Sequence, residues 1–354
     1  MPRNTYALID LNALVSNFSH LASQNPKGKT LAVIKANAYG HGASEVAKAL
    51  SACADMFAVA FVDEAKALRD DGINTPLVSL QGAYNIEEMR WAGENAVAVV
   101  VHCQEQLEWL DTLTTPPPAI WLKIDTGMHR LGFLPDQFNS IVERYAHLFD
   151  QNTVLFTHLA SSDDTTNAQT ERQLARLNEF RLRLKWPTSI ANSGGILNWR
   201  ESHGSWNRAG IALYGGKASD TNLSIPLQPV MSVFAEVIAV RTIPKGDTVG
   251  YGGTWQALRE SRIATVAIGY ADGYPRHAPI GTPAWCKGQR ISLVGRVSMD
   301  MLTFDVTDCH AITLGDQVEL WGANISAAEV AEYVGTIDYE LMTRISSRVP
   351  RRYI

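Results

Sequence analysis

Cysteine is scarce in this chain: there are four among 354 residues, with no CxxC pair, which argues against a disulfide framework or a metal site. No apolar run approaches the roughly 20 residues that span a bilayer. Residues 1–10 hold one basic residue and no extended apolar core, so they do not resemble a secretory signal. The formal net charge of -5 gives no electrostatic reason to expect nucleic acid or an anionic membrane as a partner. These absences predict a soluble, cytoplasmic, reduced protein without a metal.

What is present is the composition of a globular chain, with 46% hydrophobic and 19% charged residues. Short β-rich runs recur through the first 215 residues, and helical patterning separates most of them. The runs are 31–34, 57–61, 77–80, 97–101, 120–124, 153–157, 188–191 and 209–213, with helices expected at 43–50, 63–69, 104–113 and 169–184. Eight such alternations predict an α/β fold, a (β/α)₈ TIM-type barrel. The alternative, a doubly wound open sheet, usually carries a glycine-rich phosphate turn after its first strand, and this chain has none.

The hydrophobic pattern of the sequence changes at about residue 225. Apolar and polar residues then alternate with period two in MSVFAEVIAVRTI, RIATVAIGY, ISLVGRVSMDMLTFDV and DQVELWG, with turn signals such as PKGD and KGQR between them. This pattern predicts a mainly antiparallel β domain. We therefore expect a barrel over residues 1–225 and a smaller β domain over residues 226–354, with the first residues of the chain pairing with the second domain.

Lys35 is the most informative single residue. It ends the expected strand 31–34 and precedes a loop that contains Tyr39 and His41. In a barrel of parallel strands this end faces the active site, and a partly desolvated lysine can form a Schiff base with a carbonyl compound. A lysine that simply faces solvent is the alternative that this residue alone leaves open.

Polar and small residues recur at the ends of other expected barrel strands. They are Lys123, Asp125 and Arg130; His158 and Asp163; Asn192, Ser193, Gly194 and Gly195; and Arg208, Gly210 and Ile211. Residues 192–195 could present backbone N–H groups to an anion. Each has a structural alternative, such as a core role for His158 or a surface ion pair for Arg208. Their recurrence predicts a phosphate-bearing, carbonyl-reactive ligand at the barrel mouth, with Lys35 as its covalent anchor.

Eight motifs resemble, in order and spacing, those of the fold-type III pyridoxal-phosphate (PLP) alanine racemases. They are IKANAYGHG, KIDTGMHRLG, NSGG, RAGIALYG, YGGTW, GYADGYPR, GRVSMDM and TIDYE, and the resemblance runs from about residue 5 to the C-terminus. It implies a PLP-dependent isomerase that interconverts L-alanine and D-alanine, either to supply D-alanine for peptidoglycan or for alanine catabolism. It also implies a homodimer with shared active sites. One departure is Ala209, where many members have proline.

The resemblance implies a role for each matching residue. Lys35 would hold PLP covalently, with Tyr39, Ser193, Gly210, Ile211 and Tyr339 at its phosphate, Arg208 at its pyridine nitrogen and His158 beside its ring. Arg130 would face the phenolic oxygen and the substrate carboxylate, oriented by Lys123, which is often carbamylated in the family. Met299 would lie at the substrate, and Tyr270, Arg276, Arg296, Ile337 and Asp163 would line the entrance. Tyr251 of the other subunit, favoured over Tyr270 by its spacing, would be the second base.

The implied chemistry fits these residue types. Racemisation needs a base on each face of Cα, and we expect Lys35 to serve the D-enantiomer and Tyr251 the L-enantiomer. Arg208 has no acceptor, so it can only donate to an unprotonated ring nitrogen. This argues against a decarboxylase of the same barrel type, which in general has an acidic residue there. A serine or broad-specificity racemase is the alternative, and a non-catalytic PLP-binding homeostasis protein would lack the β domain.

Overall fold

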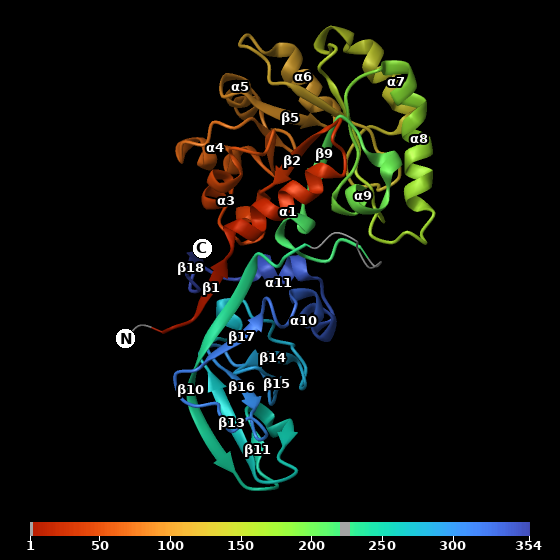
Figure 1. Ribbon diagram of the computed structural model, residues 1–354. Coiled ribbons are helices and arrows are strands. Elements are labelled where there is room, and N and C mark those ends of the chain that lie inside the picture. Colours follow the sequence, from red (N-terminus) through yellow and green to blue (C-terminus); the bar gives the residue numbers. More distant parts are fainter. Residues whose placement is uncertain (1–2, 220–226) are drawn as a thin grey trace.

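The computed structural model describes residues 3–219 and 227–354, which form a barrel and a β domain, at the top and bottom of Figure 1. The expected boundary near residue 225 lies outside the described residues. Eight parallel strands close the barrel in chain order, which confirms the predicted barrel. They are β2 (Lys29–Val33), β3 (Met56–Val59), β4 (Leu77–Ser79), β5 (Val97–Val101), β6 (Ile120–Lys123), β7 (Val154–Phe156), β8 (Thr188–Ser189) and β9 (Trp206–Ala209).

Helices surround the barrel, so its strands are buried on both faces and contain continuous apolar runs such as the fully buried β5. The helices are α1 (Leu11–Ser23), α3 (Ala43–Leu50), α4 (Val62–Asp70), α5 (Ile86–Glu94), α6 (Gln104–Thr112), α7 (Pro135–Arg144), α8 (Gln169–Leu184) and the short α9 (Ser193–Asn198), with 3₁₀ turns η1 (Ala146–Leu148) and η2 (Arg200–Ser202). Helix α8 buries Gln173, Leu174 and Leu177, a spacing of three and four residues that marks one helical face. Helices α3 and α8 span the predicted ranges.

Two strand ends differ from the sequence-based expectation. The run 209–213 is not the eighth strand: β9 ends at Ala209, and η3 (Ile211–Tyr214) is a 3₁₀ helix. All four residues of η3 are buried, and a short apolar run without alternation fits a buried helix as well as a buried strand. Lys35 does not end β2, which stops at Val33; it opens a separate turn, α2 (Lys35–Tyr39).

The second domain is an eight-stranded sheet in the order β13-β16-β15-β14-β17-β10-β1-β18. The strands are β1 (Tyr6–Ile9), β10 (Met231–Ile243), β13 (Ser261–Val266), β14 (Pro283–Cys286), β15 (Gln289–Leu293), β16 (Leu302–Asp305), β17 (Gln317–Trp321) and β18 (Arg351–Tyr353), with a small hairpin of β11 (Thr248–Val249) and β12 (Trp255–Gln256). All pairs are antiparallel except β1 with β18. The first half of β10 alternates buried and half-buried residues, which is the pattern that predicts antiparallel structure.

Two helices that the sequence pattern did not predict lie between this sheet and the barrel: α10 (Ala327–Val334) and α11 (Asp338–Arg344) (Figure 1). Helix α11 packs against α2, so the C-terminal part of the chain reaches the turn that carries Lys35. The β domain also has 3₁₀ turns η4 (Tyr251–Gly253) and η5 (Tyr270–Asp272). Within the described residues, no helix combines the length and apolar character needed to cross a bilayer.

Candidate active site

A cavity of about 790 Å³ opens where the barrel strands end, between the barrel and helices α10 and α11. The carboxyl ends of barrel strands converge at this face, so residues distant in sequence meet there. Thirteen of the residues singled out from the sequence line it: Lys35, Tyr39, Arg130, His158, Asp163, Asn192, Ser193, Gly194, Arg208, Gly210, Ile211, Ile337 and Tyr339. The cavity therefore brings together a lysine, two arginines and several hydroxyl groups.

Lys35 lies half-buried in this cavity, at the start of α2. Burial lowers its pKa, and the positive charges of Arg130 and Arg208 lower it further, while the Glu64 carboxylate opposes them. Glu64 also accepts a hydrogen bond from the backbone N–H of Ala36, at 2.6 Å, and so holds the residue after the lysine. A lysine in such surroundings is more readily deprotonated and more nucleophilic than one in water.

Arg208 is buried at the end of β9, with 2% of its surface exposed. Its guanidinium donates to Ser189 Oγ at 2.7 Å and to the carbonyl oxygens of Ile190 and Thr157 at 2.9 and 3.0 Å. Burial lowers its pKa to about 9, so it remains charged at neutral pH. Within residues 3–219 and 227–354 it has no carboxylate partner at ion-pair distance. The ring nitrogen Nδ1 of His158 lies 3.3 Å from it and must accept, because arginine only donates.

A group of hydrogen-bond donors gathers around Gly210. Ser193 Oγ accepts from the N–H groups of Gly210 and Ala212, at 2.9 and 3.2 Å, so its own hydrogen remains for another acceptor. A Cβ at Gly210 would lie 3.3 Å from Tyr39 Oη and 3.4 Å from Ser193 Oγ, so a side chain there would fill the space between the hydroxyls. Burial raises the pKa of Tyr39, which therefore stays a donor. These donors form a cradle that fits a phosphate group.

Lys123 ends β6 inside the barrel and is 6% exposed. Burial lowers its pKa to about 8, with further lowering from Arg130 and Arg208. In the part of the chain that the structure describes, no carboxylate lies within ion-pair distance of its amine. The neighbouring Asp125 instead accepts three backbone N–H groups of residues 127–129 at 2.9 to 3.1 Å, and so shapes the loop that carries Arg130.

A second set of sequence-predicted residues lies on the β domain and does not line the cavity: Tyr251, Tyr270, Arg276, Arg296 and Met299, all exposed. Tyr251 is 68% exposed. The segments around Tyr270 and Met299 are joined by a 3.0 Å hydrogen bond from Ala271 N–H to the Met299 carbonyl. The entrance residues inferred from the resemblance are thus divided, with Asp163 and Ile337 at the cavity and the other three on the β domain.

Sequence reasoning missed several residues that contact the candidate site. Tyr214 packs against Tyr39 with ring centroids 4.9 Å apart, and it lies in the RAGIALYG motif without having been assigned a role. Glu64 lies in an ordinary helical pattern that gives no local signal of its contact with Ala36. Asp338, in the TIDYE motif, accepts the N–H groups of Lys217 and Tyr339 and links α11 to the barrel.

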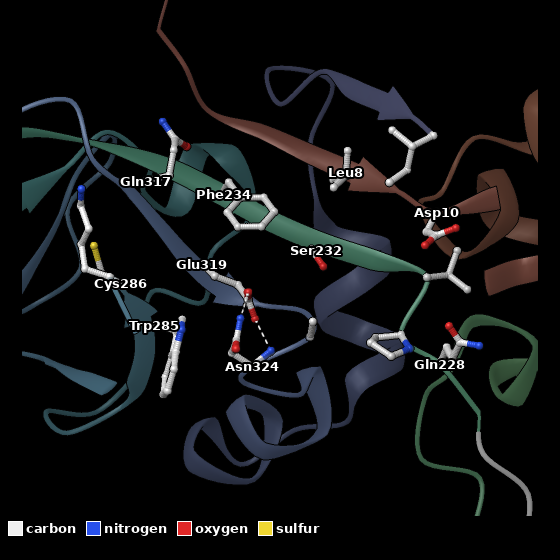
Figure 2. Close-up of a pocket in the computed structure, with 15 residues that line it drawn as sticks. Leu8, Asp10, Gln228, Ser232, Phe234, Trp285, Cys286, Gln317, Glu319 and Asn324 are labelled. Atoms are coloured by element: carbon white, nitrogen blue, oxygen red, sulfur yellow. Dashed lines mark hydrogen bonds between the residues drawn. The ribbon is translucent and has the colours of Figure 1, made fainter. Parts of the chain in front are cut away.

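A smaller hollow of about 480 Å³ lies on the β domain, along β1, β10, β14 and β17 (Figure 2). Leu8, Phe234 and Trp285 line it together with polar residues. Its buried carboxylate, Glu319, accepts from the side chain and backbone N–H of Asn324 at 2.7 Å, so it is already satisfied. None of the site residues inferred from the sequence lies there, and the barrel cavity is the better candidate.

Models of known families match both parts of the chain: "Alanine racemase, N-terminal domain" over residues 9–218 and "Alanine racemase, C-terminal domain" over residues 230–353. An alanine racemase of Alteromonas mediterranea is 47% identical over 353 residues, which cover 99% of each chain. The structure of a biosynthetic alanine racemase from Pseudomonas aeruginosa superposes with a TM-score of 0.95, at 41% identity and 99% coverage of both chains. That of an alanine racemase from Bartonella henselae with covalently bound pyridoxal phosphate gives 0.92, at 30% identity and 100% coverage of both.

Proposed function

The chain belongs to the alanine racemase family, whose reaction interconverts L-alanine and D-alanine, and we propose that it carries out this reaction with PLP bound through Lys35. One observation carries the proposal: a lysine of lowered pKa shares a cavity with a buried arginine and with a cradle of donors. When bound, PLP makes the Cα–H bond of an attached amino acid acidic.

The residues around the cavity fit this cofactor. Lys35 would hold PLP covalently, and Tyr39, Ser193, Gly210, Ile211 and Tyr339 would bind its phosphate. The cradle supports the binding of a phosphate, because hydroxyl groups that still have a hydrogen to donate suit a ligand with several acceptor oxygens. Arg208 would donate to the pyridine nitrogen, and His158 would pack beside the ring.

Racemisation requires that one group removes the Cα proton and another delivers a proton to the opposite face. We assign the D-face to Lys35 and the L-face to Tyr251. Tyr251 is 68% exposed and does not line the cavity of its own chain, so it would act in the cavity of a second copy. Tyr270 and Met299 are also exposed, and a hydrogen bond from Ala271 N–H to the Met299 carbonyl joins their segments, as expected of a surface that is covered in an assembly.

This arrangement predicts a homodimer with two shared sites. Met299 of the partner would then contact the substrate, and Tyr270, Arg276 and Arg296 of the partner would complete an entrance with Asp163 and Ile337.

Arg130 would bind the substrate carboxylate, and Lys123 would orient it as a carbamate. Lys123 supports this assignment because it is buried among cations without a carboxylate partner in the described residues. Its pKa of about 8 leaves a useful fraction of free amine at neutral pH, and that is the form that reacts with carbon dioxide. A carbamate would turn the buried positive charge into a negative one that pairs with Arg130.

Arg208 favours a racemase over a decarboxylase, because a residue that only donates leaves the ring nitrogen unprotonated. We place the enzyme in the cytoplasm, since its four cysteines are all free thiols. Its product would be D-alanine for peptidoglycan, or it would serve alanine catabolism. A serine or broad-specificity racemase is the second candidate, because the same residues would act on any small side chain.

The test is chiral chromatography of L-alanine, L-serine and larger L-amino acids after incubation with PLP-loaded protein, with Lys35→Ala as the control. D-alanine that forms fastest, approaches an equal mixture and is absent from the control supports the proposal. No D-product from any substrate, despite bound PLP, favours a PLP-binding protein without catalysis. Mixing Lys35→Ala and Tyr251→Ala subunits tests sharing: activity should return, and its absence despite confirmed subunit exchange contradicts a shared site.

A further inference from the structure

Four successive residues that are not glycine have left-handed backbone angles in α2. The φ angles of Ala36, Asn37, Ala38 and Tyr39 are 52° to 54°. Residues with a side chain adopt this conformation singly and at an energetic cost, not in a run. Such strain persists at functional sites only where surrounding contacts impose it. The turn joins Lys35 to Tyr39, so whatever holds it also sets the separation of these two side chains.

The side chain of His41 contacts two carbonyl groups of this turn. Its side chain is fully buried, and Nδ1 lies 2.9 Å from the carbonyl oxygen of Ala38 and 3.1 Å from that of Tyr39. Both partners are acceptors, so Nδ1 must carry the hydrogen. The imidazole stacks on Tyr214 at 4.4 Å, and Tyr214 donates to the carbonyl of Val33 at the end of β2. The ring is thus tied both to the turn and to the strand that precedes Lys35.

The C-terminal strand fixes the backbone around His41. Arg351 Nε donates to the Gly40 carbonyl at 3.0 Å, and Tyr353 Oη donates to the His41 carbonyl at 3.1 Å. Gly40 has a φ of 84°, and a Cβ there would collide with the carbonyl of Met342 in α11. These contacts hold the backbone at Gly40 and His41, from which Nδ1 of the imidazole reaches the two carbonyls of the turn.

We propose that His41 is a positioning residue for Lys35 and Tyr39: its Nδ1–H holds the carbonyls of Ala38 and Tyr39 and so maintains the left-handed turn. The amine and the phenol at the two ends of the turn then reach the same bound molecule. Burial, with a smaller contribution from Arg351, lowers the pKa of His41 to about 4, so the ring has one hydrogen at neutral pH. The inference rests on the proposed binding of PLP by Lys35 and Tyr39.

Two substitutions separate the hydrogen bond from the packing. His41→Phe keeps an aromatic ring against Tyr214 but removes the donor, whereas His41→Asn keeps an N–H close to the position of Nδ1. A matched control is His203→Phe, because His203 also hydrogen-bonds a backbone carbonyl, that of Ile196 at 2.9 Å, but does not line the cavity.

The first readout is the dissociation constant of PLP, titrated into PLP-free protein of native circular dichroism. The second is the fraction of PLP label on Lys35 after borohydride reduction and peptide mapping. His41→Phe should bind PLP about tenfold more weakly or worse, because the Tyr39 carbonyl loses its side-chain donor and the Ala38 carbonyl keeps only backbone donors. Part of its label should move to other lysines. His41→Asn should recover most of the affinity and label Lys35, and His203→Phe should match the wild type.

Folded His41→Phe protein with wild-type affinity and labelling overturns the inference, as does folded His41→Asn protein that fails to recover them. If His41→Phe does not fold, the test rests on His41→Asn. Affinity of this variant for PLP at the wild-type level supports the inference, and weak binding overturns it. The proposed function fails separately, if the wild-type protein itself does not bind PLP at Lys35.

Discussion

Acid should destabilise this protein through His41, and the size of the effect follows from its burial. Its pKa falls from the ordinary value of 6.5 to about 4 in the folded chain. Between these values the unfolded chain binds a proton that the folded chain does not bind, so stability falls as the pH is lowered. The contribution of neutral His41 to the free energy of unfolding is fully present above pH 6.5 and is lost progressively toward pH 4. Linkage gives a loss of about 2 kcal/mol at pH 5 and about 3 kcal/mol at pH 4.

The cause is visible around the ring. Nδ1 is occupied by the carbonyls of Ala38 and Tyr39, whereas Nε2 is buried and has no partner among the described residues. A second proton would therefore place a buried N–H without an acceptor next to Tyr214, with the positive charge of Arg351 nearby.

The assay compares urea denaturation of the wild type and of His41→Asn at pH 7.5, 6 and 5, at fixed protein and PLP concentrations. Asparagine does not titrate, so the difference in unfolding free energy between the two proteins isolates His41. His102 and His158, whose pKa values burial also lowers, remain in both proteins and largely cancel. The wild type should lose about 2 kcal/mol relative to the variant between pH 7.5 and pH 5. A difference that does not change over this range refutes the reasoning.

Three further predictions concern the cavity. Glu64→Gln should lower the pKa of Lys35 further, because the carboxylate that raises this pKa is gone while an oxygen remains for the Ala36 N–H. The midpoint of the pH dependence of PLP association should therefore shift to lower pH. An upward shift contradicts the assignment of Lys35 as the residue that binds PLP. Arg208→Glu should increase half-transamination, measured as pyridoxamine phosphate formed per turnover, and side products at the wild-type level would argue against this role. The same substitution should lower the free energy of unfolding by about 3 to 5 kcal/mol, because a buried negative charge then faces carbonyl oxygens. Removal of carbon dioxide and bicarbonate should lower the activity of the wild type reversibly but leave that of Lys123→Ala unchanged, and an equal response of both proteins would count against a carbamate.

Elements whose burial repeats along the chain could be predicted from the sequence. The segment MSVFAEVIAVRTI coincides with β10 and alternates in burial over its first half, and the periodicity at 169–184 corresponds to α8. The apolar runs of the barrel strands were also found, because each strand is covered on both faces. Where a run lacked any period, as in η3, the pattern could not separate a buried strand from a buried helix.

The candidate site was predicted as a set of motifs rather than as an arrangement. Most of the site residues inferred from the motifs line the barrel cavity, but Tyr251 and Met299 lie exposed on the other domain. Spacing along the chain carries no information about that division, because it depends on how the two domains are joined. The same holds for Asp338, whose carboxylate links α11 to Lys217 across 121 positions of the chain.

The sequence by itself determined the barrel, the β domain and the family, because apolar periodicity and the order of motifs can be recognised along the chain without its tertiary structure. Only the tertiary structure decided the shape of the turn at Lys35. Its residues, Ala36 to Tyr39, prefer right-handed or extended backbone in isolation, and nothing in their own order predicts four left-handed conformations. Besides His41, contacts from distant parts of the chain reach this turn and the residues beside it: Glu64 in α4, Tyr214 after β9 and Arg351 in the last strand. These contacts form only when the chain has folded, so the position of its most informative lysine could not be predicted from its neighbours.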